Sequence, residues 1–386
     1  MKDLDQHPGD APPVESQAST SLGPLDAGRR KVFAGLAGVA LAGVIPAGVA
    51  QSGSTKSGTT GASGEPPASI GRIDVHAHYL PAEYRRQAAA AGHSKPDGMP
   101  GLPDWNVGRA LAAMDKFGIA SALLSISSPG VHFGDDAAAR KLARLVNEEG
   151  AQAVHDHPKR FGLFASLPLP DIDGSLAELD YAMDVLHADG IVMESNHKGI
   201  YPGDPRLDPV FDALNRRKAV LFLHPTSPDC ACCTNGGLDY PRPMMEFMFE
   251  TSRAVTNLIL KGTLERYPDI RLIVPHAGAM MPVLIDRIVG LSPALGLPKP
   301  LDPEHVMSLM RRMHYDLAGY PVPRLLGALL QIADPDRLHY GSDWPFTPDP
   351  VVQRCSRQLD ETPLLAGELR SKVLRDNAAA LFPRLA

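Results

Sequence analysis

From residue 70 onward, short apolar runs alternate with longer segments whose apolar residues recur at helical spacing. Most of the short runs, such as AVLFLHP and RLIVPHAG, are almost continuously apolar, which is typical of strands buried on both faces of a parallel sheet. The pattern predicts eight strands, at Arg72–Tyr79, Ala120–Ser127, Arg160–Leu169, Gly190–Asn196, Ala219–Pro225, Arg271–Gly278, Met313–Gly319 and Leu338–Trp344.

The segments between these strands have the apolar spacing of amphipathic helices. They cover residues 105–118, 135–158, 175–190, 209–218, 244–268, 280–291, 323–333 and 364–382. Strands that alternate with helices in this way predict one (β/α)₈ TIM barrel over residues 70–386, with an open doubly wound sheet as the alternative. No glycine-rich phosphate loop follows the first predicted strand, and this favours the barrel.

The first seventy residues differ in kind from the rest of the chain. Arg29 and Arg30 precede an uncharged stretch, Val32 to Ala50, that is rich in Ala and Gly and is interrupted by Pro46. We interpret residues 1–50 as a twin-arginine-type export signal and residues 51–69 as a flexible linker. The alternative is an uncleaved membrane anchor. The export signal predicts a periplasmic protein with no stable membrane association after cleavage.

Composition adds two exclusions. The formal net charge is −6 and the basic residues are scattered, so the sequence shows no nucleic-acid-binding surface. Cys230, Cys232 and Cys233 are not followed by the second cysteine pair of a zinc ribbon. We therefore interpret them as loop cysteines, and the sequence leaves open whether they form a disulfide.

Side chains of types that can bind a metal ion stand at the carboxyl ends of several predicted strands. They are His76, His78, His224, His276 and Asp343. A TIM barrel places its active site at that rim, and alternation along a strand sends His76 and His78 to the same face. The sequence therefore predicts a metal site at the rim.

The motifs DVHAH, HP, HAG and GSDWPF, in this order, resemble the amidohydrolase superfamily, and within it the aminocarboxymuconate-semialdehyde decarboxylase-like branch. The resemblance spans residues 70–386 and extends to the closing DNAAALF. SSPGVHFGD, RLVNEEGA, FGLFASLPL and LNRRKAVLFLHP are most similar to 6-methylsalicylate-type decarboxylases. No strand-four lysine suits a carboxylated bridge, and no match exists for the substrate arginine in the first loop of the muconate decarboxylase.

The resemblance implies that His76, His78, His224 and Asp343 bind one divalent ion. Nitrogen and oxygen ligands without thiolate suit Zn²⁺, and Mn²⁺ is also possible. His276 is then left free as a general acid or base, and Asp343 is a second candidate for the proton donor. The sequence does not decide between them.

Three further residues are candidates for substrate binding. In related enzymes an arginine placed like Arg287 binds the substrate carboxylate, sometimes from a partner subunit, which implies a homodimer. His132 and His197 follow predicted strands two and four on the active rim. The alternative for each is an ordinary surface or loop residue.

The resemblance implies a metal-dependent, non-oxidative decarboxylase of a hydroxylated aromatic or unsaturated carboxylic acid, and hence a small carboxylic acid as substrate. One alternative is a hydrolase that attacks a lactone or amide on the same barrel. A non-catalytic binding protein is the other, and the free base His276 argues against it.

Overall fold

The computed structural model describes residues 71–229, 240–297 and 299–386. The predicted export signal, the linker up to residue 69 and the three loop cysteines lie outside these residues. None of the helices in the described part combines the length and apolar character needed to cross a membrane.

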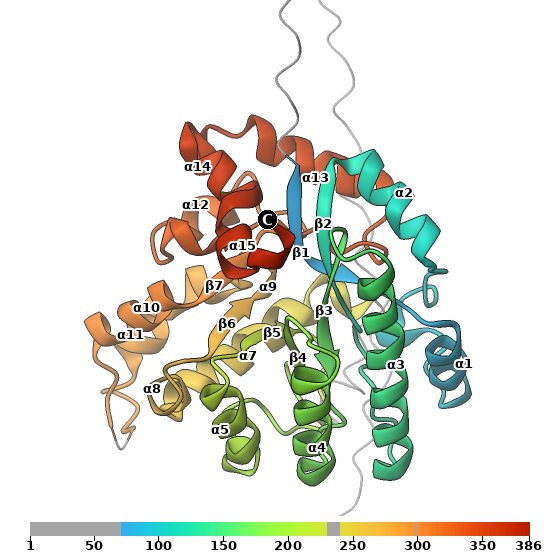
Figure 1. Cartoon of the computed structure of the whole chain (residues 1–386). Coiled ribbons are helices and arrows are strands. Elements are labelled where there is room, and N and C mark those ends of the chain that lie inside the picture. Colours follow the sequence, from blue (N-terminus) through green and yellow to red (C-terminus); the bar gives the residue numbers. More distant parts are fainter. Residues whose placement is uncertain (1–70, 230–239, 298) are drawn as a thin grey trace, which may run out of the picture. The chain divides into compact units, whose positions relative to one another are not determined.

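The strands form a barrel in which neighbours follow chain order (Figure 1). They are β1 Arg72–His78, β2 Ile119–Ser125, β3 Phe161–Ser166, β4 Gly190–Glu194, β5 Val220–His224, β6 Arg271–Val274, β7 His314–Asp316 and β8 Leu338–His339. Every pairing is parallel, and parallel bridges from Asp74 to Tyr340 and from Ala77 to Trp344 bring the last strand back to the first. The predicted TIM barrel is confirmed, and the open sheet is excluded because the strand order never reverses.

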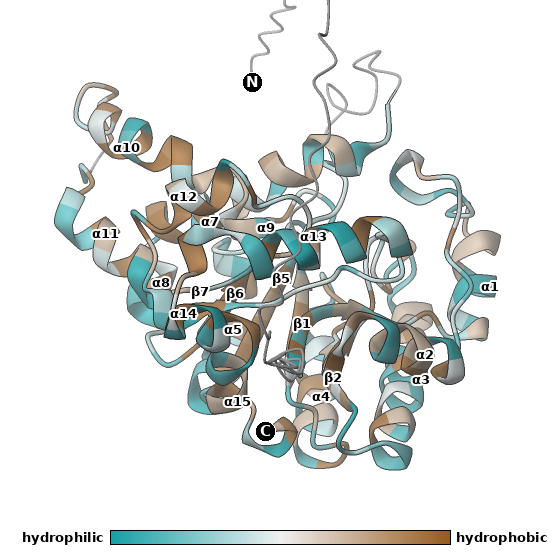
Figure 2. Ribbon diagram, turned by 90° about the horizontal axis from the view of Figure 1, so that it is seen from above, coloured by the Kyte–Doolittle hydropathy of each residue, from teal (hydrophilic) through white to brown (hydrophobic). Residues whose placement is uncertain are grey.

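Helices surround the strands, and their hydrophobic and hydrophilic residues fall on different sides (Figure 2). The principal helices are α1 Ala82–Ala90, α2 Val107–Phe117, α3 Asp136–Asp156, α4 Ile172–Asp184, α5 Asp208–Arg216, α7 Glu246–Leu260, α8 Thr263–Arg266, α9 Pro275–Gly278, α10 Met281–Leu291, α11 Pro303–Arg312, α12 Leu325–Leu329, α13 Asp349–Glu361, α14 Glu368–Ser371 and α15 Asn377–Leu381. The helical segments predicted from the sequence do not include α1, α11 or α13.

Local sequence sets the helix ends. The side chain of Asn106 caps α2 by accepting a hydrogen bond from the Arg109 amide, and Asp135 caps α3 in the same way. Gly118 ends α2 with φ of 67°, a left-handed conformation that glycine adopts without steric cost.

All eight strands end earlier than the apolar runs predict, and the difference is largest for β6 and β8. β6 stops at Val274 rather than Gly278, and β8 stops at His339 rather than Trp344. The chain then enters the left-handed region at His276, with φ of 55°, and at Asp343, with φ of 58°. Such conformations are costly for residues other than glycine and concentrate at functional sites.

The strands carry apolar residues on both faces. One apolar cluster fills the barrel, with Phe164 stacked on Phe222 at 5.3 Å between ring centroids and Phe382 packed against them. A larger cluster lies between strands and helices. This double burial accounts for the continuous apolar runs of the sequence.

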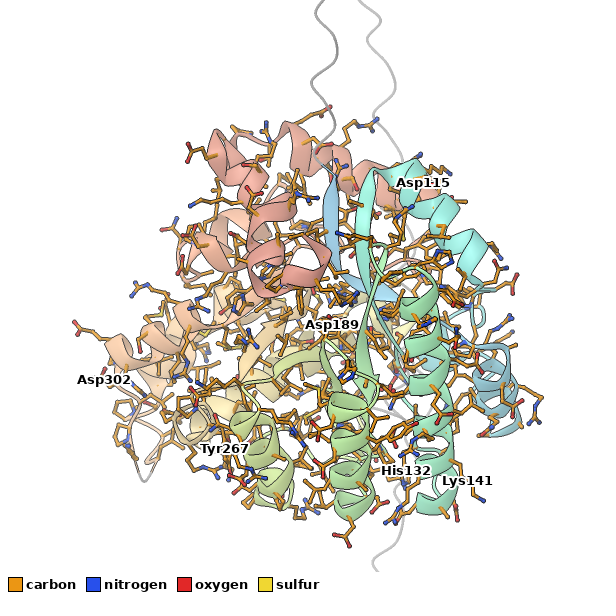
Figure 3. All side chains as sticks on the ribbon, in the orientation of Figure 1. Asp115, His132, Lys141, Asp189, Tyr267 and Asp302 are labelled. Atoms are coloured by element: carbon orange, nitrogen blue, oxygen red, sulfur yellow. The ribbon has the colours of Figure 1, made fainter. Side chains whose placement is uncertain are left out.

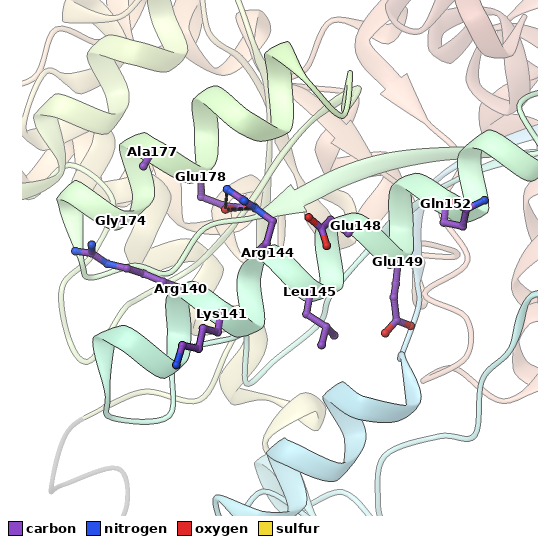
Figure 4. Close-up of a pocket in the computed structure, with 10 residues that line it drawn as sticks. All are labelled: Arg140, Lys141, Arg144, Leu145, Glu148, Glu149, Gln152, Gly174, Ala177 and Glu178. Atoms are coloured by element: carbon purple, nitrogen blue, oxygen red, sulfur yellow. Dashed lines mark hydrogen bonds and ion pairs between the residues drawn. The ribbon is translucent and has the colours of Figure 1, made fainter.

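A surface groove of about 760 Å³ lies between α3 and α4 (Figure 4). Its arginines already have acidic partners: Arg140 bonds Asp171 at 2.5 Å and Arg144 bonds Glu178 at 3.0 Å. The chemistry predicted from the sequence lies elsewhere.

Candidate metal centre

Four side chains from distant parts of the chain meet at the carboxyl ends of the strands. His76 and His78 come from β1, His224 from the end of β5, and Asp343 from the segment after β8. Their candidate ligand atoms all lie within 4.8 Å of one another. The structure therefore brings together the four residues expected to hold the ion. The three histidines among them are buried.

Hydrogen bonds on the far side of each β1 imidazole orient the rings. His76 Nδ1 lies 3.0 Å from Asp316 Oδ2, and His78 Nδ1 lies 3.2 Å from the carbonyl oxygen of Ser125. Both partners accept a hydrogen, so each Nδ1 carries it, and each ring in its neutral form presents its lone pair at Nε2. Second partners of this kind fix the tautomer of metal-binding histidines.

Backbone bonds hold Asp343 against β1. Its amide donates to the carbonyl of His76 at 2.7 Å. Asp74 Oδ1 accepts from the amides of His76 and Ser342, both at 3.0 Å. Asp343 Oδ1 then lies 3.1 Å from His78 Nε2 and 3.6 Å from His76 Nε2.

Burial and the neighbouring charges set the protonation of the ligands. Burial lowers the pKa of His78, and burial with the two other ligand histidines lowers the pKa of His224 well below its usual range. Burial would raise the pKa of Asp343, but the surrounding histidines outweigh it and hold that pKa well below its ordinary value. Neutral imidazoles and an ionised carboxylate are the forms that bind a cation.

His76 differs from the other two because carboxylates surround it. Burial favours its neutral form, but Asp316 and Asp343 outweigh burial and raise the pKa of His76 to about 9. A divalent ion bound here would have to displace that proton.

The residues fit a divalent ion. His76 Nε2 and His224 Nδ1 are buried and have no hydrogen-bond partner in the described part of the chain. Buried polar atoms without a partner are rare. Three nitrogen donors and one carboxylate oxygen form a ligand set known for Zn²⁺ and compatible with other divalent metals.

His276 lies beside this group without belonging to it. Its Nε2 is 3.8 Å from Asp343 Oδ2, and its buried Nδ1 has no partner among the described residues. Asp316 Oδ1 accepts a hydrogen bond from the backbone amide of His276 at 3.1 Å, which links this turn to the residue that orients His76.

A cavity of about 300 Å³ lies over the ends of β2–β5. It adjoins the metal centre because Glu194, in its wall, places Oε2 3.5 Å from His224 Nδ1. The wall includes His132 and His197, so both predicted contact residues face this space.

The two histidines of the cavity wall, His132 and His197, differ in their surroundings. His132, labelled near the start of α3 in Figure 3, bonds Asp136 at 2.8 Å. His197 is partly buried, and its burial together with His132 lowers its pKa to about 3. His197 Nε2 has no partner among the described residues, so it can face a bound molecule as a neutral ring.

Arg287 lies away from these groups. It is exposed on α10, does not line the cavity, and makes no hydrogen bond or ion pair with the described residues of its own chain. The structure of one chain therefore does not bring Arg287 into the candidate site.

Sequence reasoning missed two carboxyl groups. Asp316 ends β7 in HYDLAG, and Glu194 ends β4. Both stand at strand ends, the rule that located the ligands, but neither belongs to the motifs DVHAH, HP, HAG or GSDWPF.

A family model described as Amidohydrolase matches residues 73–384. The chain belongs to this family. It is 34% identical over 329 residues to the decarboxylase yanB of Aspergillus niger, covering 82% of this chain and 88% of that protein. It is also 34% identical over 322 residues to the 6-methylsalicylic acid decarboxylase acuB of Aspergillus aculeatus, covering 81% of this chain and 96% of the other.

Among solved structures, the fold is similar to that of a dihydroxybenzoic acid decarboxylase from Polaromonas sp. JS666 with bound manganese and 2-nitroresorcinol. The TM-score is 0.69 at 22% identity, covering 81% of this chain and 97% of that one. This likeness supports the barrel.

Proposed function

We propose that this amidohydrolase-family chain is a metal-dependent, non-oxidative decarboxylase of a hydroxylated aromatic carboxylic acid. The observation that carries the proposal is the four-ligand cluster with His276 Nε2 3.8 Å from Asp343 Oδ2, next to a cavity of about 300 Å³. The two Aspergillus relatives, both named as decarboxylases, support the same reaction.

The reaction replaces a carboxylate by a proton. The bond between the ring carbon and the carboxylate breaks, carbon dioxide leaves, and the electron pair stays with the ring, so no oxidant or reductant is needed. An aryl anion is too unstable to form, so the ring carbon must be protonated before the bond breaks. His276, beside the cluster, would deliver that proton, and Asp343 is the alternative donor.

His76, His78, His224 and Asp343 would hold the ion. A divalent ion there would act as a Lewis acid toward the carboxylate and phenolate oxygens of the substrate. The ligand set suits Zn²⁺, and the manganese in the Polaromonas structure supports Mn²⁺ as the other candidate.

The test uses purified protein stripped of metal and reloaded with Mn²⁺ or Zn²⁺. With 6-methylsalicylate or 2,6-dihydroxybenzoate we expect carbon dioxide and 3-methylphenol or resorcinol, respectively, and none of these products without metal. The variant His276→Ala, loaded with the same metal, is the matched control. Hydrolysis of lactones or amides without carbon dioxide release from any hydroxybenzoate would favour the hydrolase instead.

Arg287 is proposed to act in a homodimer, where it reaches the substrate of the partner subunit. Its exposure, and the lack of a side-chain partner among the described residues of its own chain, support this arrangement. A guanidinium can bind a carboxylate through two parallel hydrogen bonds. Arg287→Ala and His276→Ala, each expected to be inactive alone, should restore partial activity when their subunits exchange. No recovery despite demonstrated exchange would contradict the proposal.

Export is proposed on the sequence alone. Residues 1–50 would be removed in the periplasm, leaving a mature chain that starts near Gln51. N-terminal sequencing of the protein from the periplasmic fraction tests this. A chain that keeps Met1, or that stays with the membrane, would contradict it.

A further inference from the structure

The cavity beside the metal centre contains a carboxyl group that the proposed reaction does not use. Glu194 is 8% exposed and lines this cavity from the end of β4. Its Oε2 is buried and has no hydrogen-bond partner in the described part of the chain. Leaving such an oxygen unpaired costs free energy, which a bound molecule that donates a hydrogen would recover.

A second carboxyl group lines the same space. Asp97 lies in the short helix Pro96–Gly98 of the first loop. One of its oxygens accepts a hydrogen bond from Ser227, and the other is buried without a partner among the described residues. Burial, and then the charge of Asp97, raise the pKa of Glu194 well above its usual range, so the two carboxyl groups influence each other.

These groups determine which part of a substrate can lie against them. A substrate carboxylate would meet two acidic groups here, whereas the metal centre attracts it. Among the described residues of the wall, Lys198 is the one with a permanent positive charge. The carboxylate should therefore lie at the metal, leaving the ring edge to face Glu194.

We propose that Glu194, with Asp97 in the same wall, accepts a hydrogen bond from a second ring hydroxyl of the aromatic acid and thereby selects dihydroxylated over monohydroxylated substrates. A carboxyl oxygen can accept this hydrogen whether or not the group is ionised. The inference rests on the proposed function and assigns a specificity-determining residue to the same site.

A competing role for Glu194 is to support or join the metal centre, since its Oε2 lies 3.5 Å from His224 Nδ1, the nitrogen left free for the ion. A positioning carboxylate of that kind changes metal affinity when it is removed. A carboxyl group that reads a substrate hydroxyl changes ligand preference instead. The two roles can be separated by measuring both quantities.

The experiment measures binding, so it needs no turnover. The full chain loaded with Mn²⁺ is titrated calorimetrically with 2-nitrophenol and with its four derivatives that carry one further ring hydroxyl, which are isomers of one another: 2-nitroresorcinol, 4-nitroresorcinol, 2-nitrohydroquinone and 3-nitrocatechol. We expect at least one of these isomers to bind about tenfold more tightly than 2-nitrophenol, as one added hydrogen bond to a carboxyl group allows.

In Glu194→Met that advantage should disappear while metal content stays the same. Glu149→Met, the same substitution at an exposed position of α3, should keep it. Glu194→Leu repeats the test if the methionine variant fails to fold. Three outcomes overturn the proposal: no isomer is preferred by the wild type, the preference survives in the variant, or the variant loses its metal. Carbon dioxide release separately tests the proposed function.

Discussion

Two groups of histidines are buried in this barrel, and they use their ring nitrogens in opposite ways. At the rim, His76, His78 and His224 direct nitrogens toward one point near Asp343. In the barrel wall, His314 of β7 and His339 of β8 stack on each other at 5.1 Å between ring centroids. Burial alone therefore does not make a histidine a ligand.

The wall pair uses its lone pairs internally. Arg337 Nη1 lies 2.9 Å from His314 Nε2, and His314 Nδ1 lies 2.9 Å from His339 Nε2. Arginine can only donate, so His314 Nε2 accepts from Arg337. The single ring hydrogen of His314 then lies on Nδ1, which donates it to His339 Nε2. This leaves no nitrogen lone pair of the pair for a metal.

Carboxylates account for much of the difference. At the rim, Asp316 and Asp343 outweigh burial and raise the pKa of His76 to about 9. In the wall, burial and then His339 lower the pKa of His314 to about 2, and burial lowers the pKa of His339 to about 4. The rim therefore attracts positive charge at His76, whereas the barrel wall excludes it from both of its histidines.

Removing a rim ligand should have the largest effect. His224→Ala and Asp343→Ala should lose both activity and metal, with metal affinity falling by at least about a hundredfold, because each deletes a donor of a four-ligand set. His276→Ala should lose activity but keep its metal. Elemental analysis of the purified variants measures this. Equal metal loss in His276→Ala would make His276 a ligand.

The wall pair should instead affect stability in acid. Its folded-state pKa values lie below the ordinary value of 6.5 for histidine, so below that pH the unfolded chain binds protons that the folded chain excludes. Stability contributed by the neutral pair is present above pH 6.5 and is lost as the pH falls toward the folded pKa. For His339, with a folded pKa of about 4, the loss amounts to about 3 kcal/mol.

Urea unfolding of the metal-free protein near pH 7 and near pH 4.5 measures this loss. His339→Gln should show a smaller loss than the wild type, because the folded core no longer excludes that proton. His305→Gln, at a partly exposed histidine of α11, should behave like the wild type. An unchanged loss in His339→Gln would mean that other groups control acid unfolding.

The contrast also shows what the sequence could predict. His76, His78, His224 and Asp343 follow apolar runs, so the barrel rule is enough to bring them together at one rim. Asp316 and Glu194 also end strands, but their roles depend on distances to His76 and His224 that no spacing in the sequence encodes. The sequence of one chain does not decide the role of Arg287, because its proposed contact lies on another chain.

Helices α1, α11 and α13 were missed for a different reason. α13 contains DPVVQRCSRQLDE, in which few residues are strongly apolar, yet Val352, Cys355 and Leu359 are buried. These three residues recur at helical spacing, and packing onto the barrel stabilises such a helix even where its apolar residues are few.

Weakening the hydrogen bond that orients one rim histidine, His76, should have a moderate effect on metal affinity. Asp316→Asn keeps the size of the side chain, but its single oxygen cannot accept from His76 Nδ1 and also from the amides of His276 and Ala318. The asparagine NH₂ would then face His76 and favour the tautomer with hydrogen on Nε2. We expect metal affinity to fall by about 10- to 100-fold, measured by competition with a chelator. An unchanged affinity would mean that His76 is oriented by packing alone.

The smallest effect is expected at His78, whose support comes largely from the backbone. The hydroxyl of Ser125 lies 3.0 Å from His78 Nδ1, but the carbonyl of the same residue lies 3.2 Å away and accepts the same hydrogen. Ser125→Ala removes the hydroxyl and leaves the carbonyl, so the tautomer is preserved. In the chelator competition used for Asp316→Asn, metal affinity should change by less than about threefold, since a neutral hydrogen bond contributes little when its partner stays paired. A loss as large as that of Asp316→Asn would show that the hydroxyl, rather than the strand, orients His78.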